Sequence, residues 1–268
     1  MHTWPGTGRA FALASLFNEG ELLKKGVFMK TILHKAAERG HANHGWLDSY
    51  HSFSFAHFYD PAKVHFGALR VLNDDTVKAG FGFSKHPHDN MEIVSIPLFG
   101  DLEHKDSTGR HEIIKQNDVQ IMSAGSGIAH SEMNANKDKE VKFLQVWVFP
   151  KEQNITPRYE QKTFNPEDRN NKILTVVAPD NKDAVWITQD AWFSLGKMDK
   201  DFTTTYSIKN NGNGVYAFVL EGEVTINDEK LGKRDAIGIW DTDNISITAN
   251  TNAEILLIDV PMKLEGVA

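Results

Sequence analysis

The 268-residue sequence contains no cysteine, so disulfide bonds, thiolate metal ligands and cysteine nucleophiles are all excluded. It also has no apolar run approaching the roughly 20 residues that a membrane-spanning helix requires. The formal net charge of −7 and the sequence pI near 5.9 argue against direct nucleic-acid binding, because such binding needs a basic surface that neutralises phosphates. We therefore predict a protein of the reducing cytoplasm, with neither nucleic acid nor membrane as a partner.

Helix signals are sparse as well. From Thr31 onward the chain consists of short apolar or alternating runs separated by Gly, Asn and Asp turns, a pattern typical of an all-β sandwich or barrel. The run 141–149 is apolar on both faces, which indicates a central, buried strand. The clearest predicted strands are 66–72, 91–98, 102–105, 112–115, 119–123 and 141–149.

The second half of the chain repeats the first in outline. Residues 98–103 resemble 220–225, and residues 117–121 resemble 234–238. The two offsets nearly agree, since 222 − 100 = 122 for the glycines and 235 − 118 = 117 for the aspartates. This repetition predicts a duplicated β-barrel.

The segment 150–157, which begins and ends with proline, is the expected connection between the halves. We predict an N-terminal metal-binding domain at 29–150 and a C-terminal domain without metal ligands at 151–268. Residues 1–28 differ in composition, and Met29 followed by Lys30 resembles a natural start. They are expected to be a leader outside the fold; an amphipathic helix packed on the body is the alternative.

Histidine is distributed unequally between the halves. All 12 histidines lie at or before His130, so only the first half can build an imidazole site. His86 and His88 lie one residue apart, as do His130 and Glu132, and positions i and i+2 of a strand point to the same face. Three imidazoles and a carboxylate suit iron, manganese, nickel or copper and leave coordination positions open for substrate or dioxygen.

The spacing of these residues resembles two known motifs. Gly80-x5-His86-x-His88-x3-Glu92 is similar to the first cupin motif, and Gly125-x-Gly127-x2-His130 is similar to the second. The second motif has Gly125 in place of the usual proline and Glu132 after the histidine. These departures resemble the pirin family of two-domain cupins, and the segments 40–49 and 155–161 resemble its bacterial branch.

The resemblance implies a bicupin fold of two tandem β-barrels, or jelly rolls. It places one divalent transition metal per chain on His86, His88, His130 and Glu132; the metal is usually iron in pirins, with Mn, Ni, Cu, Co or Zn as alternatives. Bacterial members similar to this chain open flavonols such as quercetin with dioxygen and release carbon monoxide. On that basis we expect a flavonol-like aromatic substrate, O₂ as co-substrate and a monomeric quercetin 2,3-dioxygenase-like oxidoreductase.

Two other functions remain open at this stage. Animal pirins resemble redox-sensitive cofactors of transcription regulators, which implies a non-catalytic iron-binding protein that docks a protein partner. A different cupin chemistry, such as isomerisation or decarboxylation, would use the same ligands as a Lewis acid.

Other residues receive more modest interpretations. In the dioxygenase reading, Glu132 is the catalytic proton acceptor for the 3-hydroxyl of the flavonol. Glu92 is interpreted as structural or as orienting a histidine through its free ring nitrogen. Two further groups are expected to serve packing or turns, namely the histidines 41, 44, 51 and 57 and the core aromatics Phe53, Phe55 and Phe58.

Overall fold

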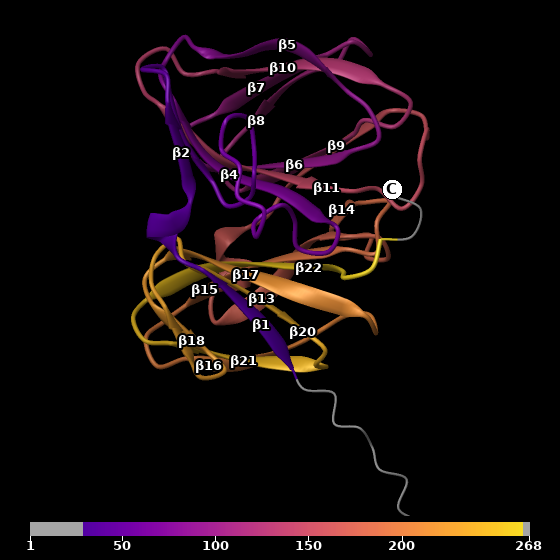
Figure 1. Cartoon of the computed structure of the whole chain (residues 1–268). Coiled ribbons are helices and arrows are strands. Elements are labelled where there is room, and N and C mark those ends of the chain that lie inside the picture. The colour runs from indigo at the N-terminus through magenta and orange to yellow at the C-terminus, as the bar shows by residue number, and fades with distance from the viewer. Residues whose placement is uncertain (1–28, 265–268) are drawn as a thin grey trace, which may run out of the picture.

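The computed structural model describes residues 29–264 (Figure 1). Strands dominate, and the helical segments of this described part are two 3-10 helices, η1 (Ala36–Glu38) and η2 (Pro166–Arg169). The prediction of an all-β protein built of two tandem barrels is confirmed. Between residues 29 and 264 no helix combines the length and the apolar character needed to cross a membrane.

The first barrel encloses its interior between two sheets. The seven-stranded sheet runs, in spatial order, through β12 (Arg158–Thr163), β9 (Asp118–Ser123), β6 (Glu92–Phe99), β11 (Val141–Val148), β4 (Leu69–Val77), β3 (Leu47–His51) and β2 (Gly40–Asn43). The four-stranded sheet runs through β5 (Gly82–His88), β10 (Ile128–Asn134), β7 (Leu102–Asp106) and β8 (His111–Ile114).

The second barrel has the same two-sheet organisation. Its seven-stranded sheet runs through β1 (Lys30–His34), β20 (Ala236–Trp240), β17 (Asn213–Glu221), β22 (Ala253–Pro261), β15 (Trp192–Met198), β13 (Lys172–Ala178) and β14 (Val185–Trp186). Its four-stranded sheet runs through β16 (Thr203–Ser207), β21 (Asn244–Ala249), β18 (Val224–Ile226) and β19 (Glu229–Leu231).

The predicted strands are present with small shifts at their ends. β11 lies in the centre of its sheet, between β6 and β4, as the apolar character of 141–149 predicted. The strand predicted at 66–72 differs most from the observed one: β4 begins at Leu69 and continues to Val77. Phe66 forms only an isolated bridge to Leu69.

The repeat detected in the sequence is a repeat of structure. Gly100 directly follows β6 and Gly222 directly follows β17, at φ values of 72° and 78°. Such positive φ values favour glycine, and at Gly222 a Cβ would lie 2.2 Å from the Asn252 carbonyl oxygen. The two halves therefore conserve the turn as well as the strand order.

The barrels exchange their edge strands. β1 pairs with β20 and completes the sheet of the second barrel, although it lies within the predicted first domain, 29–150. β12 pairs with β9 and completes the sheet of the first barrel, although it lies within 151–268. Each exchanged strand lies at the same sheet position as the other, so the two chain halves are tied together at both ends. The predicted leader, 1–28, lies outside the described residues.

The four sheets form four layers, with the two seven-stranded sheets at the centre (Figure 1). Side chains alternate along each strand, so Val94 and Ile96 face the other barrel while Ile93 faces its own interior. Phe218 and Tyr216 contribute from the second barrel to the same inter-barrel core. This apolar interface fixes the central sheet that floors the first barrel.

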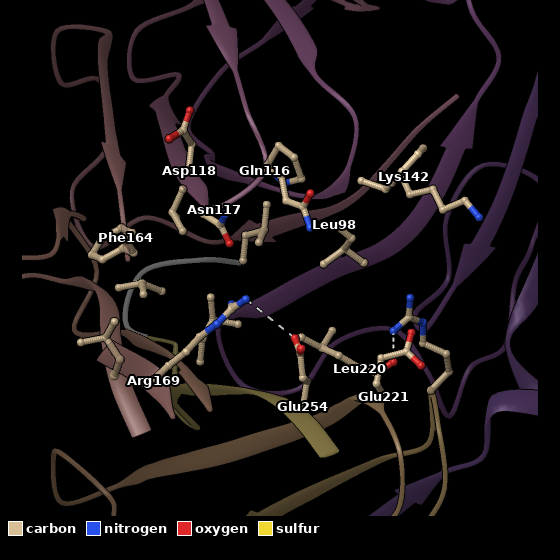
Figure 2. Close-up of a pocket in the computed structure, with 18 of the residues that line it drawn as sticks. Leu98, Gln116, Asn117, Asp118, Lys142, Phe164, Arg169, Leu220, Glu221 and Glu254 are labelled. Atoms are coloured by element: carbon tan, nitrogen blue, oxygen red, sulfur yellow. Dashed lines mark hydrogen bonds and ion pairs between the residues drawn. The ribbon is translucent and has the colours of Figure 1, made fainter. Parts of the chain in front are cut away.

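Ion pairs supplement the apolar interface. A cleft of about 390 Å³ between the barrels is lined by residues of both, including Leu98 and Leu220 (Figure 2). Figure 2 shows Arg169, at the end of η2, pointing across the cleft toward Glu254 of β22, with 3.8 Å between the paired atoms. That pair lies within the second barrel. Arg234 Nε, from the second half of the chain, lies 2.8 Å from Asp74 Oδ2 of β4, and this ion pair joins the barrels.

Candidate metal centre and cavity

Three histidines converge inside the first barrel. His86 and His88 lie on β5, and His130 lies on the neighbouring strand β10 directly opposite His86. The ring centroid of His130 lies 4.5 Å from that of His86 and 4.9 Å from that of His88. One ligand nitrogen from each of the three lies within 4.8 Å of the others. The i, i+2 spacing of the sequence therefore becomes a convergent site through strand pairing.

The nitrogens of this cluster are suited to a metal. His88 Nε2 and both ring nitrogens of His130 are buried without a hydrogen-bond partner in the described structure, which is costly unless something else binds them. Burial, reinforced by His86, lowers the pKa of His88 to about 4 and that of His130 to about 2. Both rings are therefore neutral at pH 7, as metal ligands must be.

His86 is oriented by the backbone of its own strand. Its Nδ1–H donates to the Ser84 carbonyl oxygen at 2.8 Å. A histidine that donates from one ring nitrogen presents the lone pair of the other, the tautomer that a metal ligand needs. These three histidines form one candidate site for a single transition metal.

Glu132 lies on β10, two residues after His130, and is buried at 2% exposure. Its carboxylate accepts hydrogen bonds from Gln145 Nε2 at 2.5 Å and from Ser95 Oγ at 3.2 Å. Burial raises the pKa of this carboxyl above its ordinary value. Among the described residues the ligand atoms within 4.8 Å of one another come from the three histidines and not from Glu132. Its role as fourth ligand stays a prediction.

Glu92 occupies a different environment. Its carboxylate accepts hydrogen bonds from Ser123 Oγ at 2.8 Å and from Thr188 Oγ1 at 2.9 Å. Thr188 belongs to the second half of the chain, so this buried glutamate links the barrels. These contacts agree with the structural interpretation of Glu92. They do not support the alternative, that Glu92 orients a histidine, because its oxygens bind hydroxyl groups.

One residue of the site was missed by sequence reasoning. His104 of β7 lies directly opposite Glu132 in the strand register, and its ring centroid is 5.3 Å from that of His130. Its Nε2 is 2.9 Å from an oxygen of Asp106. His104 stands outside both cupin-like motifs, and its only sequence signal is the spacing His104-x-Asp106 on a short predicted strand.

A cavity of about 660 Å³ opens beside the histidines, within the size range of small-molecule sites. Its aromatic wall is continuous: Trp147 meets His88 edge to face at 4.9 Å, and Phe55 meets Trp147 at 5.4 Å. Glu132 and Gln145 also line it. The cavity thus joins the candidate metal site to an apolar surface that suits a planar aromatic molecule.

Four histidines that precede the motifs in sequence were predicted to serve packing or turns, and this interpretation was incomplete. They line this cavity, although they lie far from the motifs in sequence, because β2, β3 and the following loop close one side of the barrel. Phe53 is buried in the inter-barrel core as expected, but Phe55 and Phe58 line the cavity. The histidines concerned are His41, His44, His51 and His57.

Comparisons with known proteins agree with this geometry. The family model described as Pirin matches residues 33–148, and the one described as Quercetinase C-terminal cupin domain matches residues 175–260. Quercetin 2,3-dioxygenase of Escherichia coli K12 is 45% identical over 230 residues, which cover 85% of this chain and 98% of that relative. A pirin-like protein of Caulobacter vibrioides is 39% identical over 82% of this chain and 95% of its own length.

A solved structure shows the same fold. The crystal structure of the bacterial pirin YhhW from Escherichia coli, in complex with nickel(II), aligns with a TM-score of 0.82 at 44% identity and covers 87% of this chain and 99% of that one. The identity, the coverage and the two family matches together establish that this chain belongs to the pirin family.

Proposed function

We propose that this pirin is a metal-dependent dioxygenase that opens flavonols such as quercetin with O₂ and releases carbon monoxide. One observation carries the proposal: three convergent histidines with unpartnered ring nitrogens lie beside a 660 Å³ cavity that has an aromatic wall. The names of the relatives that are 45% and 36% identical, quercetin 2,3-dioxygenase and putative quercetin 2,3-dioxygenase, support it.

We propose His86, His88, His130 and Glu132 as the ligands of one divalent metal, with iron as its identity. The nickel complex of the Escherichia coli pirin supports a transition metal in this family and keeps nickel as the alternative. When bound, such a metal supplies a Lewis-acid charge that favours the ionised form of a coordinating hydroxyl group. A cytoplasmic location and a monomeric state stay predictions.

The protein's own groups would hold the substrate and move one proton. Glu132 accepts the proton of the flavonol 3-hydroxyl, since burial gives its carboxyl a raised pKa and therefore a stronger affinity for that proton. Gln145 and Ser95 fix the direction of the carboxylate. Trp147 N–H donates to Gln145 Oε1 at 3.1 Å, which turns the amide NH₂ of Gln145 toward Glu132. The aromatic wall positions the substrate ring and excludes water.

The test is aerobic incubation of metal-analysed protein with a panel of flavonols, following the ring-opened product and carbon monoxide. Turnover in proportion to metal content is the expected result. Full metal content without turnover on any flavonol would contradict the proposal and favour the redox-sensitive binding protein instead.

A further inference from the structure

Four polar side chains without a part in the proposed chemistry form one corner of the cavity. Ser49 and His51 lie on β3, directly opposite Asp75 and Asn73 of β4. Directly opposed residues of a sheet point to the same face, and all four line the cavity shared with His86. Their exposed fractions are 4% or less. We call this group the polar corner.

The hydrogen bonds of the polar corner run in one direction. The Ser49 hydroxyl donates to Asp75 Oδ1, and Ser49 Oγ lies 2.8 Å from His51 Nε2. Because a hydroxyl has a single hydrogen, His51 Nε2–H must be the donor of the second bond. The proton of His51 is thereby fixed on Nε2, and His51 Nδ1 keeps a lone pair.

Two hydrogen-bond acceptors of this corner are left unused. His51 Nδ1 and Asn73 Oδ1 are buried without a hydrogen-bond partner in the part of the chain that the structure describes. A buried polar atom without a partner destabilises the structure that holds it. Two neighbouring acceptors on a cavity wall are satisfied by a ligand that carries hydroxyl hydrogens.

The polar corner and the histidine cluster face one cavity from different layers. The corner belongs to the seven-stranded sheet, whereas His86 and His88 belong to the four-stranded sheet. Ring contacts connect the two: Phe55 lies edge to face with His51 at 5.3 Å and with Trp147 at 5.4 Å, and Trp147 meets His88. A flat molecule lying along this wall would have its two ends at chemically different sites.

We propose that His51 and Asn73 accept hydrogen bonds from hydroxyl groups on the part of the substrate that is remote from the metal. Ser49 and Asp75 act as positioning residues that hold His51 in its accepting tautomer. The corner thus selects polyhydroxylated aromatic substrates over those with unsubstituted outer rings, since the latter leave both buried acceptors unpaired. The inference rests on the proposed function for the identity of the substrate as a flavonol.

Two flavonols provide the test. Quercetin carries hydroxyl groups on both outer rings, whereas 3-hydroxyflavone retains the 3-hydroxyl alone. The affinity of the metal-loaded protein for each is measured without oxygen by quenching of tryptophan fluorescence. Burial raises the pKa of Asp75 to about 7, so the measurement is made at pH 8, where its carboxylate form predominates. We expect quercetin to bind about 10-fold or more tightly than 3-hydroxyflavone, as two hydrogen bonds of ordinary strength imply.

Variants test whether the polar corner causes the difference in affinity between the two flavonols. In Asn73→Leu and in His51→Phe the affinity ratio should fall toward 1, and in Ser49→Ala it should fall partway, because His51 is no longer held in one tautomer. Phe58→Leu is the matched control: Phe58 also lines the cavity, so the change removes apolar wall from both ligands and should preserve the ratio. Loss of affinity for both flavonols alike in the Asn73 and His51 variants would overturn the proposal.

Equal affinities in the wild-type protein would overturn it without any variant, so a variant that fails to fold does not decide the matter. The two proposals also fail separately. A preserved affinity ratio with no ring-opened product would contradict the dioxygenase function alone. Normal turnover with equal affinities for the two flavonols would contradict the polar corner alone.

Discussion

Across the middle of each seven-stranded sheet runs a row of directly opposed residues that face the interior of the barrel, and the two rows differ in polarity. In the first barrel the row is His51, Asn73, Gln145, Ser95 and Gln120. At the equivalent positions of the second barrel it is Thr175, Ser194, Leu257, Ala217 and Ile237.

The equivalence follows from the repeat itself. Ser95 and Ala217 are separated by 217 − 95 = 122 positions, as are Gly100 and Gly222, and Gln120 and Ile237 are separated by 117. The second row contributes to a closely packed apolar interior, while His51, Asn73 and Gln145 of the first row line a cavity. The first row also contains buried atoms without partners, such as Gln120 Nε2. One fold thus accommodates either a packed core or a polar site, and the site has a cost in stability.

The largest expected effect is on metal content. Changing His88 to Ala removes one of three convergent ligands, so metal per chain should fall from about one to a small fraction of that value. Elemental analysis of the purified protein measures it. His41→Ala is the control, because His41 lines the cavity but lies outside the histidine cluster. Undiminished occupancy in the His88 variant, or two metals in the wild-type chain, would refute the single site in the first barrel.

Of the two buried glutamates, Glu132 belongs to the candidate site and Glu92 to the barrel interface, so the same substitution should affect them differently. At matched metal content, Glu132→Gln should lower the rate of flavonol opening by about 10² to 10⁴-fold, the usual contribution of a positioned base. Glu92→Gln should change the rate far less, because Glu92 binds Ser123 and Thr188 between the barrels. Steady-state kinetics on quercetin distinguishes them. If Glu92→Gln abolished metal binding while Glu132→Gln kept metal and activity, the assignment of Glu132 would be wrong.

Exchanging the two rows at one position tests their difference directly. Ile237→Gln places an amide in the apolar interior and should lower the free energy of unfolding by about 3 kcal/mol or more, through lost burial and an unpaired polar group. Gln120→Leu should raise it by about 1 kcal/mol, because the buried Nε2 of Gln120 has no partner. Denaturant titration of both variants gives the values. Comparable losses in the two would show that the first row is as closely packed as the second.

The smallest effect concerns His34, which the exchanged strand β1 carries to the inter-barrel interface, 2.9 Å from the Tyr216 hydroxyl. Burial, followed by the charge of Lys63, lowers the pKa of His34 to about 4. Its contribution to stability is complete above the unfolded pKa of about 6.5 and declines as the pH falls toward 4, since the unfolded chain then binds the proton more readily.

As the pH falls between about 6.5 and 4, the free energy of unfolding of the wild-type protein should decrease by about 1.4 kcal/mol more per pH unit than that of His34→Gln. Denaturant titrations at pH 7.5, 5.5 and 5.0 measure the difference, and the pH 7.5 pair, in which the ring is neutral, serves as the reference. Parallel pH profiles for the two proteins would contradict this account.

The sequence by itself determined the class of the fold and the convergent histidines. Alternation along short runs predicts strands because a strand has a period of two, and the i, i+2 spacing of His86 and His88 places both rings on one face whatever the strand pairs with. The repeated glycines also indicate the duplication, since a turn with positive φ favours glycine in both halves.

Only the tertiary structure decided which distant residues meet. His51 and Asn73 line the cavity because β3 and β4 pair at the side of the sheet, and no local pattern encodes that register. His104 reaches His130 across a strand pair, and Glu92 turns to a hydroxyl of the other barrel instead of to a histidine. The exchange of β1 and β12 is likewise invisible in the sequence, because an edge strand forms the same backbone hydrogen bonds with either sheet. Long-range pairing, rather than residue type, therefore made these contacts.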